Sequence, residues 1–256
     1  MPTALITGAT SGIGYSFARR LAADGFDLVL VARTRERLEE VAAELHEEFD
    51  VQTQVLRADL AKLVDVRRVE NALTDQEIDL LVNNAGFGLY EGDFLSHDLE
   101  TEDEMVLVNV RAVLRLTYAA VGAMVERGEG SVINVSSVAS FAPDPLAPTY
   151  AASKAWVTAF TQGLREQLSG TGVSLLALTP GLVPTGFQDR AGVEANVPGM
   201  FWLDADAVVD TALKDLRSGH GVSVPGLAYR AIRVAMQYTP RRFYLPLTGA
   251  VMQRLT

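Results

Sequence analysis

Short apolar runs alternate with longer segments of helical spacing along most of the chain. The apolar runs are too short for helices and end at glycine or polar residues, so we expect buried strands: Thr3–Thr7, Asp27–Ala32, Val51–Arg57, Ile78–Val82, Ser131–Ser136, Val173–Leu178 and a short Val222–Val224. Segments with apolar residues on one face predict helices: Thr34–Phe49, Ala61–Gln76, Leu99–Arg127, Tyr150–Leu168 and Asp204–Leu216. Strands that alternate with helices in this way are typical of parallel sheets.

The pattern predicts an α/β fold. We expect a single Rossmann-like domain, with a doubly wound parallel sheet of about seven strands flanked by helices. No linker, internal repeat or low-complexity stretch divides residues 1–226, so we assign them to one domain. Residues 227–256 are predicted to form a basic, apolar, helical tail, and Gly186–Leu203 a loop or lid.

A glycine-rich turn follows the first strand. Thr7–Gly14 lies between that strand and a segment with helical spacing, a geometry that points backbone N–H groups and a helix N-terminus at a phosphate. The spacing G-x-x-x-G-x-G differs from the G-x-G-x-x-G fingerprint, and a plain tight turn is the alternative. The expected cofactor-binding residues here are Gly8, Thr10, Ser11, Gly12, Ile13 and Gly14.

The second strand ends at Ala32 and is followed by Arg33, with no acidic residue before Glu36. In dinucleotide sites an acid at this strand end binds the ribose 2′-hydroxyl, whereas an arginine accommodates a 2′-phosphate. A charge-assisted hydrogen bond is worth about 1.5–3 kcal/mol, or roughly 10- to 100-fold in preference. Arg33 therefore predicts NADP(H) over NAD(H), unless it is a solvated arginine at a helix start.

Further candidate residues follow the third and fourth strands. Ligands of doubly wound sheets bind at the carboxyl ends of the strands, where these residues are expected to meet the glycine turn and Arg33. The candidates for cofactor contact at these ends are Asp59, Leu60, Asn83, Ala85 and Gly86.

Tyr150 and Lys154 are four residues apart in a predicted helix, so they share one face, one turn apart. A tyrosine alone has a pKa of about 10, too high for proton transfer at neutral pH. An ammonium at about 4 Å would favour the phenolate by roughly 4 kcal/mol at an effective dielectric of about 20. We expect Lys154 to lower the pKa of Tyr150, which would then work as a general acid or base, although this pair spacing also occurs by chance.

Composition excludes several kinds of site. There is no cysteine, which excludes disulfides and thiolate chemistry, and the three histidines lack metal-ligand spacing, so no metal site is expected. A net charge of −10 argues against general nucleic-acid binding. The N-terminus does not resemble a signal peptide, and no apolar run reaches about 18 residues, so we expect a soluble, cytoplasmic protein.

Together these motifs resemble those of the short-chain dehydrogenase/reductase family, from Thr3 to about Gly226. The segments that carry the resemblance are Thr7–Gly14, Asn83–Gly86, Asn109, Ser137, Tyr150 with Lys154, and Pro180-Gly181 with Thr185. Ser137 precedes Tyr150 by 13 residues, as in the family, whereas the neighbouring Ser136 has the wrong gap. The segment 83–94 and the pattern around Arg33 are similar to an NADP-using reductase subgroup of varied substrates.

The resemblance implies a role for each residue. Tyr150 would protonate the substrate oxygen as hydride arrives, or take that proton in oxidation, and Lys154 would lower its pKa and hold the nicotinamide ribose. Ser137 would donate a hydrogen bond to the carbonyl oxygen. Asn109 would hold a water in a proton relay, or make a purely structural bond. Thr185 would contact the nicotinamide carboxamide, and the cofactor-binding set also includes Tyr150, Lys154, Pro180, Gly181 and Val183.

The predicted activity is hydride transfer between NADP(H) and a small-molecule carbonyl or alcohol. Apolar residues near the expected mouth suit an apolar substrate, or simply pack the lid: Phe87, Leu89, Tyr90, Phe141, Leu146, Val183, Phe187, Met200, Phe201 and Trp202. The alternatives are a non-catalytic NADP-binding sensor, and a partner- or membrane-binding protein that acts through its tail. Length disfavours a sugar epimerase of the longer related branch.

The C-terminal segment departs from the family pattern. Many members end in a strand with a paired-glycine signature that helps to build a tetramer, whereas here Val224-Pro225-Gly226 precedes a tail with five arginines and no acid. On a helix Leu227–Tyr238 the polar stripe is narrow, so the apolar remainder must be covered. We expect packing on the body or in a homodimer or homotetramer; peripheral contact of residues 227–256 with an anionic membrane and disorder are the alternatives. Deletion of 227–256 is expected to change oligomeric state or solubility and to spare NADPH binding.

Overall fold

The computed structural model describes residues 1–90, 92–184 and 198–239. Its sheet has seven strands, all paired in parallel, in the order β3-β2-β1-β4-β5-β6-β7. The strands are β1 (Thr3–Thr7), β2 (Asp27–Ala32), β3 (Thr53–Arg57), β4 (Leu80–Asn83), β5 (Gly130–Val135), β6 (Val173–Leu178) and β7 (Val222–Ser223). This topology confirms the predicted doubly wound, Rossmann-like α/β fold.

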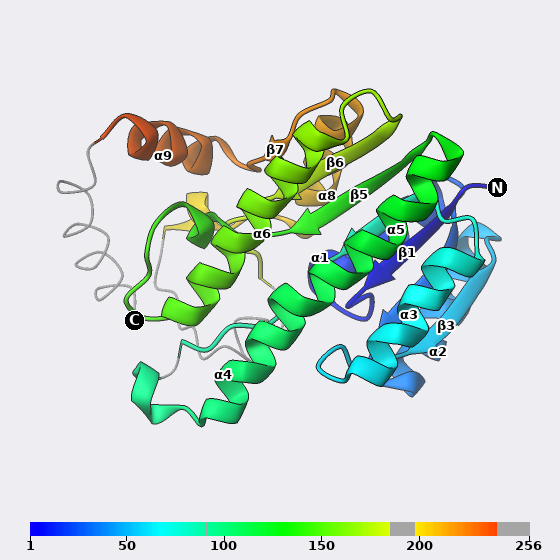
Figure 1. The fold of residues 1–256 in the computed structure, drawn as a ribbon, viewed down its shortest axis with the longest axis horizontal. Coiled ribbons are helices and arrows are strands. Elements are labelled where there is room, and N and C mark those ends of the chain that lie inside the picture. The colour runs from blue at the N-terminus through cyan, green and yellow to red at the C-terminus, as the bar shows by residue number, and fades with distance from the viewer. Residues whose placement is uncertain (91, 185–197, 240–256) are drawn as a thin grey trace.

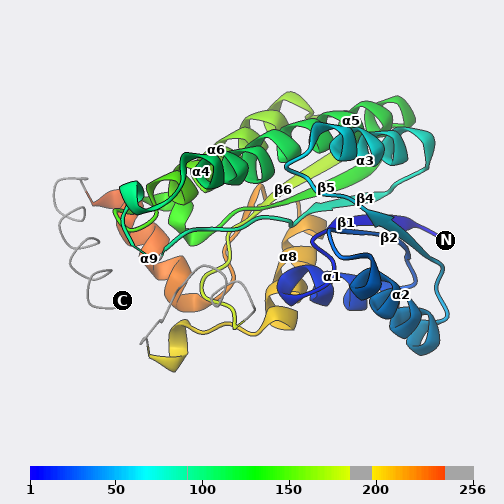
Figure 2. The same cartoon turned by 90° about the horizontal axis from the view of Figure 1, so that it is seen from below.

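Helices cover both faces of the sheet, so the molecule has three layers (Figures 1 and 2). One face carries α3 (Leu63–Asp75), α4 (Leu99–Val106), α5 (Val113–Arg127) and α6 (Pro148–Gln167), and the other carries α1 (Gly12–Ala23), α2 (Arg35–Phe49) and α8 (Ala205–Arg217). Short 3₁₀ turns are η1 (Phe94–Ser96), η3 (Val138–Phe141) and η4 (Gly199–Phe201).

The central strands are buried on both faces, which is why they read as continuous apolar runs and not as alternating ones. In β1, Ala4 and Ile6 belong to the core under α1, α2 and α8, whereas Leu5 belongs to the core under α3 and α5. All three side chains are fully buried. Because successive side chains of a strand point to opposite faces, this five-residue segment contributes side chains to two hydrophobic cores.

The predicted helix Leu99–Arg127 is one continuous helical span with an irregular centre. Between α4 and α5 lies a π-helical segment, η2 (Leu107–Ala112), in which Val108, Asn109 and Ala112 are buried. The span is 29 residues long and, by length and composition alone, apolar enough to cross a membrane, which the sequence analysis did not expect. Leu116, Ala120 and Met124 of this span belong to a hydrophobic core that also contains residues of the sheet.

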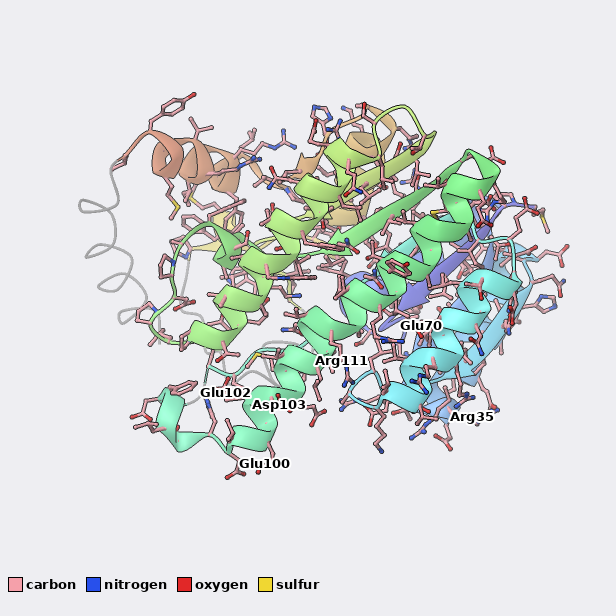
Figure 3. All side chains as sticks on the ribbon, viewed as in Figure 1. Arg35, Glu70, Glu100, Glu102, Asp103 and Arg111 are labelled. Atoms are coloured by element: carbon pink, nitrogen blue, oxygen red, sulfur yellow. The ribbon has the colours of Figure 1, made fainter. Side chains whose placement is uncertain are left out.

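Polar contacts bridge α3 and α5 at their solvent edge. Arg115 on α5 pairs with Glu70 on α3 at 2.6 Å, and Arg111 in η2 donates a hydrogen bond to the Ala61 carbonyl at 2.6 Å. Figure 3 shows Glu70 and Arg111 on these neighbouring elements. Arg111 thus joins η2 to the segment that precedes α3, and Arg115 joins α5 to α3 itself.

Helix α9 (Leu227–Tyr238) is not an appendage of the folded body. Tyr229 is 8% exposed, and its hydroxyl accepts a hydrogen bond from Leu182 N at 3.0 Å and donates one to the Phe201 carbonyl at 2.8 Å. A Cβ on Gly181 would lie 2.0 Å from the Tyr229 ring, so that glycine is required for the helix to dock. The expected boundary at residue 226 therefore cuts through a packed region; residues 240–256 lie outside the described part.

Candidate active site

A cavity of about 1140 Å³ lies at the carboxyl ends of the strands. Its lining includes residues that directly follow β1, β2, β3, β4 and β5, and Pro180 two residues after β6, which is where ligands of doubly wound sheets bind. Most of the residues predicted for the site line it: Gly8, Thr10, Ser11, Gly12, Ile13, Arg33, Asp59, Leu60, Ala85, Gly86, Ser137, Tyr150, Lys154, Pro180, Gly181 and Val183.

The glycine turn forms one end of this cavity. Gly8 and Gly12 have φ angles of +68° and +54°, which side chains rarely adopt, and a Cβ on Gly8 would lie 2.8 Å from the Asn84 side chain. Helix α1 begins at Gly12, and its N-cap Ser11 makes no capping hydrogen bond. The first N–H groups of α1 are therefore available to an anion in the cavity.

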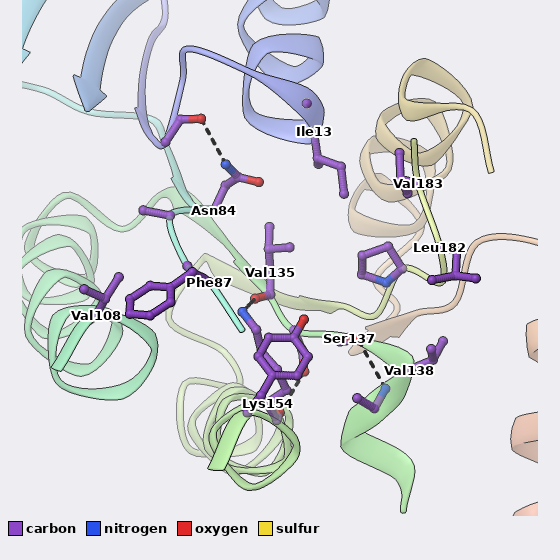
Figure 4. Close-up of a pocket in the computed structure, with 18 of the residues that line it drawn as sticks. Ile13, Asn84, Phe87, Val108, Val135, Ser137, Val138, Lys154, Leu182 and Val183 are labelled. Atoms are coloured by element: carbon purple, nitrogen blue, oxygen red, sulfur yellow. Dashed lines mark hydrogen bonds between the residues drawn. The ribbon is translucent and has the colours of Figure 1, made fainter. Parts of the chain in front are cut away.

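Asn84 lies in the predicted segment Asn83–Gly86, but the sequence analysis did not count it among the residues that contact the cofactor. Its side-chain amide donates to the carbonyls of Thr7 and Gly8, at 3.0 and 3.2 Å, and so fixes the glycine turn to the end of β4 (Figure 4). Asn83, which was predicted instead, is 3% exposed and donates to Thr117 and Asn134, away from the cavity. All four residues of β4 are buried, so no alternation in the sequence shows which of the two asparagines reaches the cavity.

Gly14 and Thr185 complete the account of the predicted cofactor residues. Gly14 does not line the cavity; a Cβ there would lie 2.2 Å from the Gly8 carbonyl oxygen, so Gly14 permits close packing of α1 against the turn. Thr185 lies outside the described residues.

Arg33 and Asp59 line the same cavity, at the ends of β2 and β3. The Arg33 side chain is 68% exposed, and its guanidinium lies 3.9 Å from the Glu104 carboxylate, a contact too long and too exposed to fix it. Asp59 lies 3.5 Å from the Lys62 ammonium, and its backbone N–H donates to Asp65. This end of the cavity thus offers a cation, Arg33, that remains available to an anionic group.

Ser137, Tyr150 and Lys154 all line this cavity. Figure 4 shows Ser137 and Lys154 among its lining residues. Ser137 is the N-cap of η3, where its hydroxyl accepts a hydrogen bond from Ala139 N at 3.1 Å. Tyr150 and Lys154 lie one turn apart on α6, which begins at Pro148, two residues before the predicted start. The Lys154 ammonium donates to the Val135 carbonyl at 3.0 Å and lies 5.7 Å from the centre of the Tyr150 ring.

Burial dominates the ionisation of this pair. Tyr150 is 6% exposed, and burial raises its pKa to about 12 against the opposing effect of a hydrogen bond with Ser137. Burial lowers the pKa of Lys154 to about 8. The expected net lowering of the Tyr150 pKa is therefore not found, because burial, which removes the phenolate from water, is the largest effect on this group.

Asn109 occupies the π-helical segment η2 and is fully buried. Its side-chain oxygen accepts from Phe87 N at 3.1 Å, and its amide donates to the Phe87 carbonyl at 2.9 Å and to Ser153 at 3.1 Å. These bonds fix the loop after β4 to α6, one residue from Lys154. Asn109 does not line the cavity, so the structure gives its side chain a positioning role, and the water relay stays a prediction.

The other end of the cavity is largely apolar. Of the residues expected near the mouth, Phe87, Tyr90, Leu146, Val183 and Phe201 line it, Leu89, Phe141, Met200 and Trp202 do not, and Phe187 lies outside the described residues. The sequence analysis missed the contribution of α9, which adds Tyr229, Ile232 and Met236. No local signal identifies these three, since the contact between Tyr229 and Leu182 spans 47 residues of sequence.

The residues present fit a nicotinamide adenine dinucleotide phosphate. Two features match a pyrophosphate: the backbone at Gly8, where a Cβ would fill the space, and the uncapped helix N-terminus at Gly12. The available side chain of Arg33 matches a 2′-phosphate. The same cavity continues to Tyr150 and Lys154. Among the described residues no cluster of three His, Asp or Glu side chains could hold a metal ion.

Comparison with known proteins agrees with this geometry. A family model described as short chain dehydrogenase matches residues 2–196. The chain is 36% identical over 186 residues to a very-long-chain 3-oxoacyl-CoA reductase of Anas platyrhynchos; the alignment covers 71% of this chain and 60% of that reductase.

Two solved structures are similar over nearly the whole chain. A short-chain dehydrogenase from Sphingobium yanoikuyae in complex with NADPH is 37% identical, with a TM-score of 0.85 and coverage of 93% of this chain and 94% of the other. A bulky-bulky ketone specific alcohol dehydrogenase from Comamonas testosteroni is 33% identical, with a TM-score of 0.81 and coverage of 95% and 98%.

Proposed function

We propose that this chain, which belongs to the short-chain dehydrogenase family, uses NADPH to reduce a bulky and largely apolar ketone at Tyr150. As a member of that family it is an NADP(H)-dependent oxidoreductase that acts on carbonyl and alcohol groups. The non-catalytic sensor considered from the sequence is not favoured. The substrate class, the direction and the residue roles are the proposal.

One observation carries the substrate class. The cavity that contains Ser137, Tyr150 and Lys154 continues into a wall of apolar side chains, to which Phe87, Phe201 and α9 contribute. Burial of apolar substrate surface against such a wall stabilises binding by about 25 cal/mol per Å². The same wall offers few hydrogen-bond partners to a polyhydroxylated sugar. The solved relative from Comamonas testosteroni is described as specific for bulky-bulky ketones, which supports the same class.

NADPH, when bound, supplies the hydride that reduces the carbonyl carbon. The Tyr150 hydroxyl donates a hydrogen bond to the carbonyl oxygen and transfers its proton as that oxygen gains charge. Ser137 donates a second hydrogen bond to the same oxygen, where the charge develops. The Lys154 ammonium stabilises the phenolate that remains on Tyr150, and its buried side chain is held by the Val135 carbonyl. The raised pKa of Tyr150 keeps the acid protonated at neutral pH, which suits reduction.

The test is NADPH oxidation, followed by absorbance, with a matched series of ketones. The series runs from acetone to ketones with two bulky apolar substituents. The proposal expects kcat/KM to increase with the size of both substituents. A preference for acetone or for polyhydroxylated ketones would contradict it, and a Tyr150→Phe preparation controls for contaminating reductases.

A second candidate substrate is a 3-oxoacyl thioester. The relative from Anas platyrhynchos is named for such a substrate, and the mouth of the cavity here is flanked by the basic helix α9, where Arg230 is exposed and Arg233 lies 5.5 Å over the Phe141 ring. Arginines beside an apolar cavity suit an acyl chain attached to an anionic carrier. A 3-oxoacyl-CoA and the matching free 3-oxo ester in the same assay distinguish the candidates, since only this reading expects the CoA ester to be preferred.

The homo-oligomer, the cytoplasmic location and peripheral membrane contact are further proposals. Helix α9 leaves Leu227, Val234 and Tyr238 more than half exposed, which supports an additional partner for this surface. Light scattering of the full chain and of a 1–239 chain, with liposome co-sedimentation, distinguishes the outcomes. Because α9 lines the cavity, a 1–226 chain is now expected to lose substrate binding as well. A monomeric chain that does not co-sediment with liposomes would rule out both the homo-oligomer and the membrane contact.

A further inference from the structure

Glu104 is an acidic residue of the cavity to which the mechanism assigns no role. It lies on α4 and lines the cavity together with Thr101, three residues before it, and Val108, four residues after it. Residues with this spacing share one face of a helical span, so the helix itself turns Glu104 towards the cavity. The next residue, Met105, is buried in the same apolar cluster as Tyr150 of α6, which fixes α4 to the body.

The Glu104 carboxylate forms a loose ion pair with Arg33. Glu104 Oε1 lies 3.9 Å from Arg33 Nη1, and the two side chains are 41% and 68% exposed, so both are open to a ligand in the cavity that they line. A pair between such exposed groups is weak, so a stronger anion can take its place at the arginine. The main chain of Arg33 is fixed, since Arg57 Nε donates to its carbonyl oxygen at 3.1 Å.

Asp59, at the end of the neighbouring strand β3, is a second acid that lines the cavity, but its carboxylate already has other partners. Oδ1 accepts a hydrogen bond from Ala61 N at 3.2 Å, and Oδ2 lies 3.5 Å from the Lys62 ammonium. Within the described residues, Arg33 and Glu104 form an ion pair only with each other. Glu104 is therefore the carboxylate that acts on Arg33 and on whatever Arg33 binds.

An acid at this place has a known use in dinucleotide sites, where a carboxylate at the end of the second strand binds the ribose 2′-hydroxyl. Here the residue after β2 is Arg33, and the chain has no acid before Glu36. Glu104 brings a carboxylate to Arg33 from a helix far along the sequence. The site thus combines a cation for a 2′-phosphate with an acceptor for a 2′-hydroxyl.

We propose that Glu104 sets the cofactor selectivity of this site. Its carboxylate accepts a hydrogen bond from the ribose 2′-hydroxyl of NADH, and it competes with the 2′-phosphate of NADPH for Arg33. The phosphate carries about two negative charges and is repelled by a carboxylate so close to its arginine, whereas a hydroxyl donates to that carboxylate. The inference rests on the proposed function in one respect, that Arg33 binds the 2′-phosphate, and it adds NADH as a second cofactor.

The first test measures the Kd of NADPH and of NADH by fluorescence titration of the wild type, Glu104→Ala and Glu104→Gln. Glu104→Ala should bind NADPH about 3- to 10-fold more tightly, because an exposed charge no longer repels the phosphate. It should bind NADH about 3- to 10-fold more weakly, because a hydrogen bond is lost. Glu104→Gln should gain NADPH affinity and keep that for NADH within about twofold, since an amide oxygen still accepts from a hydroxyl.

Two controls accompany these variants. Asp103→Asn removes the same charge from the same helix, but Asp103 is exposed and does not line the cavity (Figure 3), so both of its Kd values should stay within about twofold of the wild type. In a double variant, Arg33→Ala with Glu104→Ala, the gain in NADPH affinity should vanish relative to Arg33→Ala, because the competition requires the arginine. Alanine is the strongest helix former, so Glu104→Ala retains α4.

A second measurement isolates the adenosine end and depends on no turnover. Calorimetric titration compares adenosine 2′,5′-bisphosphate with AMP, which differ in the 2′-phosphate and contain no nicotinamide. Glu104→Ala should bind the bisphosphate more tightly than the wild type does, and AMP more weakly. A general loss of structure would weaken the binding of both ligands.

The outcomes separate the inference from the function on which it rests. If the wild type reduces no ketone, the proposed ketone reductase fails, and the titrations still decide the role of Glu104. If the two Kd values of Glu104→Ala shift in the same direction, or if either stays within about twofold of the wild type, Glu104 does not set the selectivity and the ketone reductase stands. A gain in NADPH affinity that persists in the double variant would overturn the competition for Arg33.

Discussion

The two ends of the cavity are built in different ways. The cofactor end is made largely of backbone: the turn from Gly8 to Gly12, the N-terminus of α1 and the strand end at Arg33, which all lie within the first 33 residues. The substrate end is made of side chains from segments that are far apart in sequence, among them the loop with Asp144, η4 and α9. Tyr150 and Lys154 line the cavity that both ends share, and the proposed proton transfer at Tyr150 marks where the two ends meet.

The difference determines what each end recognises. Backbone N–H groups at a helix N-terminus bind any pyrophosphate, so that end is suited to a cofactor shared by many enzymes. Side chains can be exchanged without altering the fold, so the other end is free to specify one substrate. Substitutions at the two ends should therefore separate: one set changes cofactor affinity, the other changes the KM for the ketone.

The largest effect is expected where the ends meet. Tyr150→Phe removes the proton donor and should lower kcat by about 10²- to 10⁴-fold, with NADPH affinity close to that of the wild type. Stopped-flow reduction and fluorescence titration of NADPH measure the two quantities. Activity within about threefold of the wild type would exclude Tyr150 as the acid.

At the cofactor end, Arg33→Ala should raise the Kd for NADPH by about 10- to 100-fold and leave that for NADH nearly unchanged, because only the bond to the 2′-phosphate is lost. The matched control is Arg35→Ala on the same segment, since Arg35 pairs at 3.0 Å with Glu39, its neighbour one turn along α2. Equal losses for NADPH and NADH would mean that Arg33 supports the fold and does not read the phosphate.

At the substrate end, Tyr229→Phe removes the hydroxyl that joins Leu182 to Phe201. The loss of these two bonds costs about 1–2 kcal/mol, so the KM for a bulky ketone should rise roughly 5- to 30-fold, with NADPH affinity unchanged. Tyr238→Phe on the same helix is the control, because that side chain is 79% exposed. A loss of NADPH affinity in Tyr229→Phe would show that the two ends are not independent.

The smallest expected effect is a pH dependence of kcat/KM that originates at Lys154, where the two ends of the cavity meet. Burial lowers the pKa of Lys154 to about 8, so its ammonium is present below pH 8 and lost above it. The kcat/KM for reduction reports the free enzyme and should therefore decrease about fivefold from pH 8 to pH 9. The raised pKa of Tyr150 adds no decrease in this range. A profile that is flat to pH 10, or one that keeps this decrease in Lys154→Met, would exclude Lys154 as its source.

The same contrast explains how much the sequence could predict. The strands, the glycine turn and the parallel, doubly wound sheet follow from local periodicity, and the sequence is sufficient for them. The assignment of Ser137, Tyr150 and Lys154 came from the resemblance to the family. The sequence analysis chose Asn83 for the site, whereas Asn84 lines the cavity, because periodicity leaves the end of β4 uncertain by a residue. The place of α9 on the cavity depends on Tyr229, whose partners are distant in sequence, and the raised pKa of Tyr150 depends on burial that no short pattern reports.

The π-helical segment η2 has a consequence for insertions and deletions in related genes. A π turn holds one residue more than an α turn, so it behaves as a single-residue insertion absorbed within a helix. Deleting one codon inside Leu107–Ala112 would restore an uninterrupted α-helix and rotate everything on its N-terminal side by about 100° about the axis. Met105 would then leave the core while α5 stayed in place. The extra residue in η2 therefore sets the rotation of α4 relative to α5 about the helix axis, and with it the position of the loop after β4.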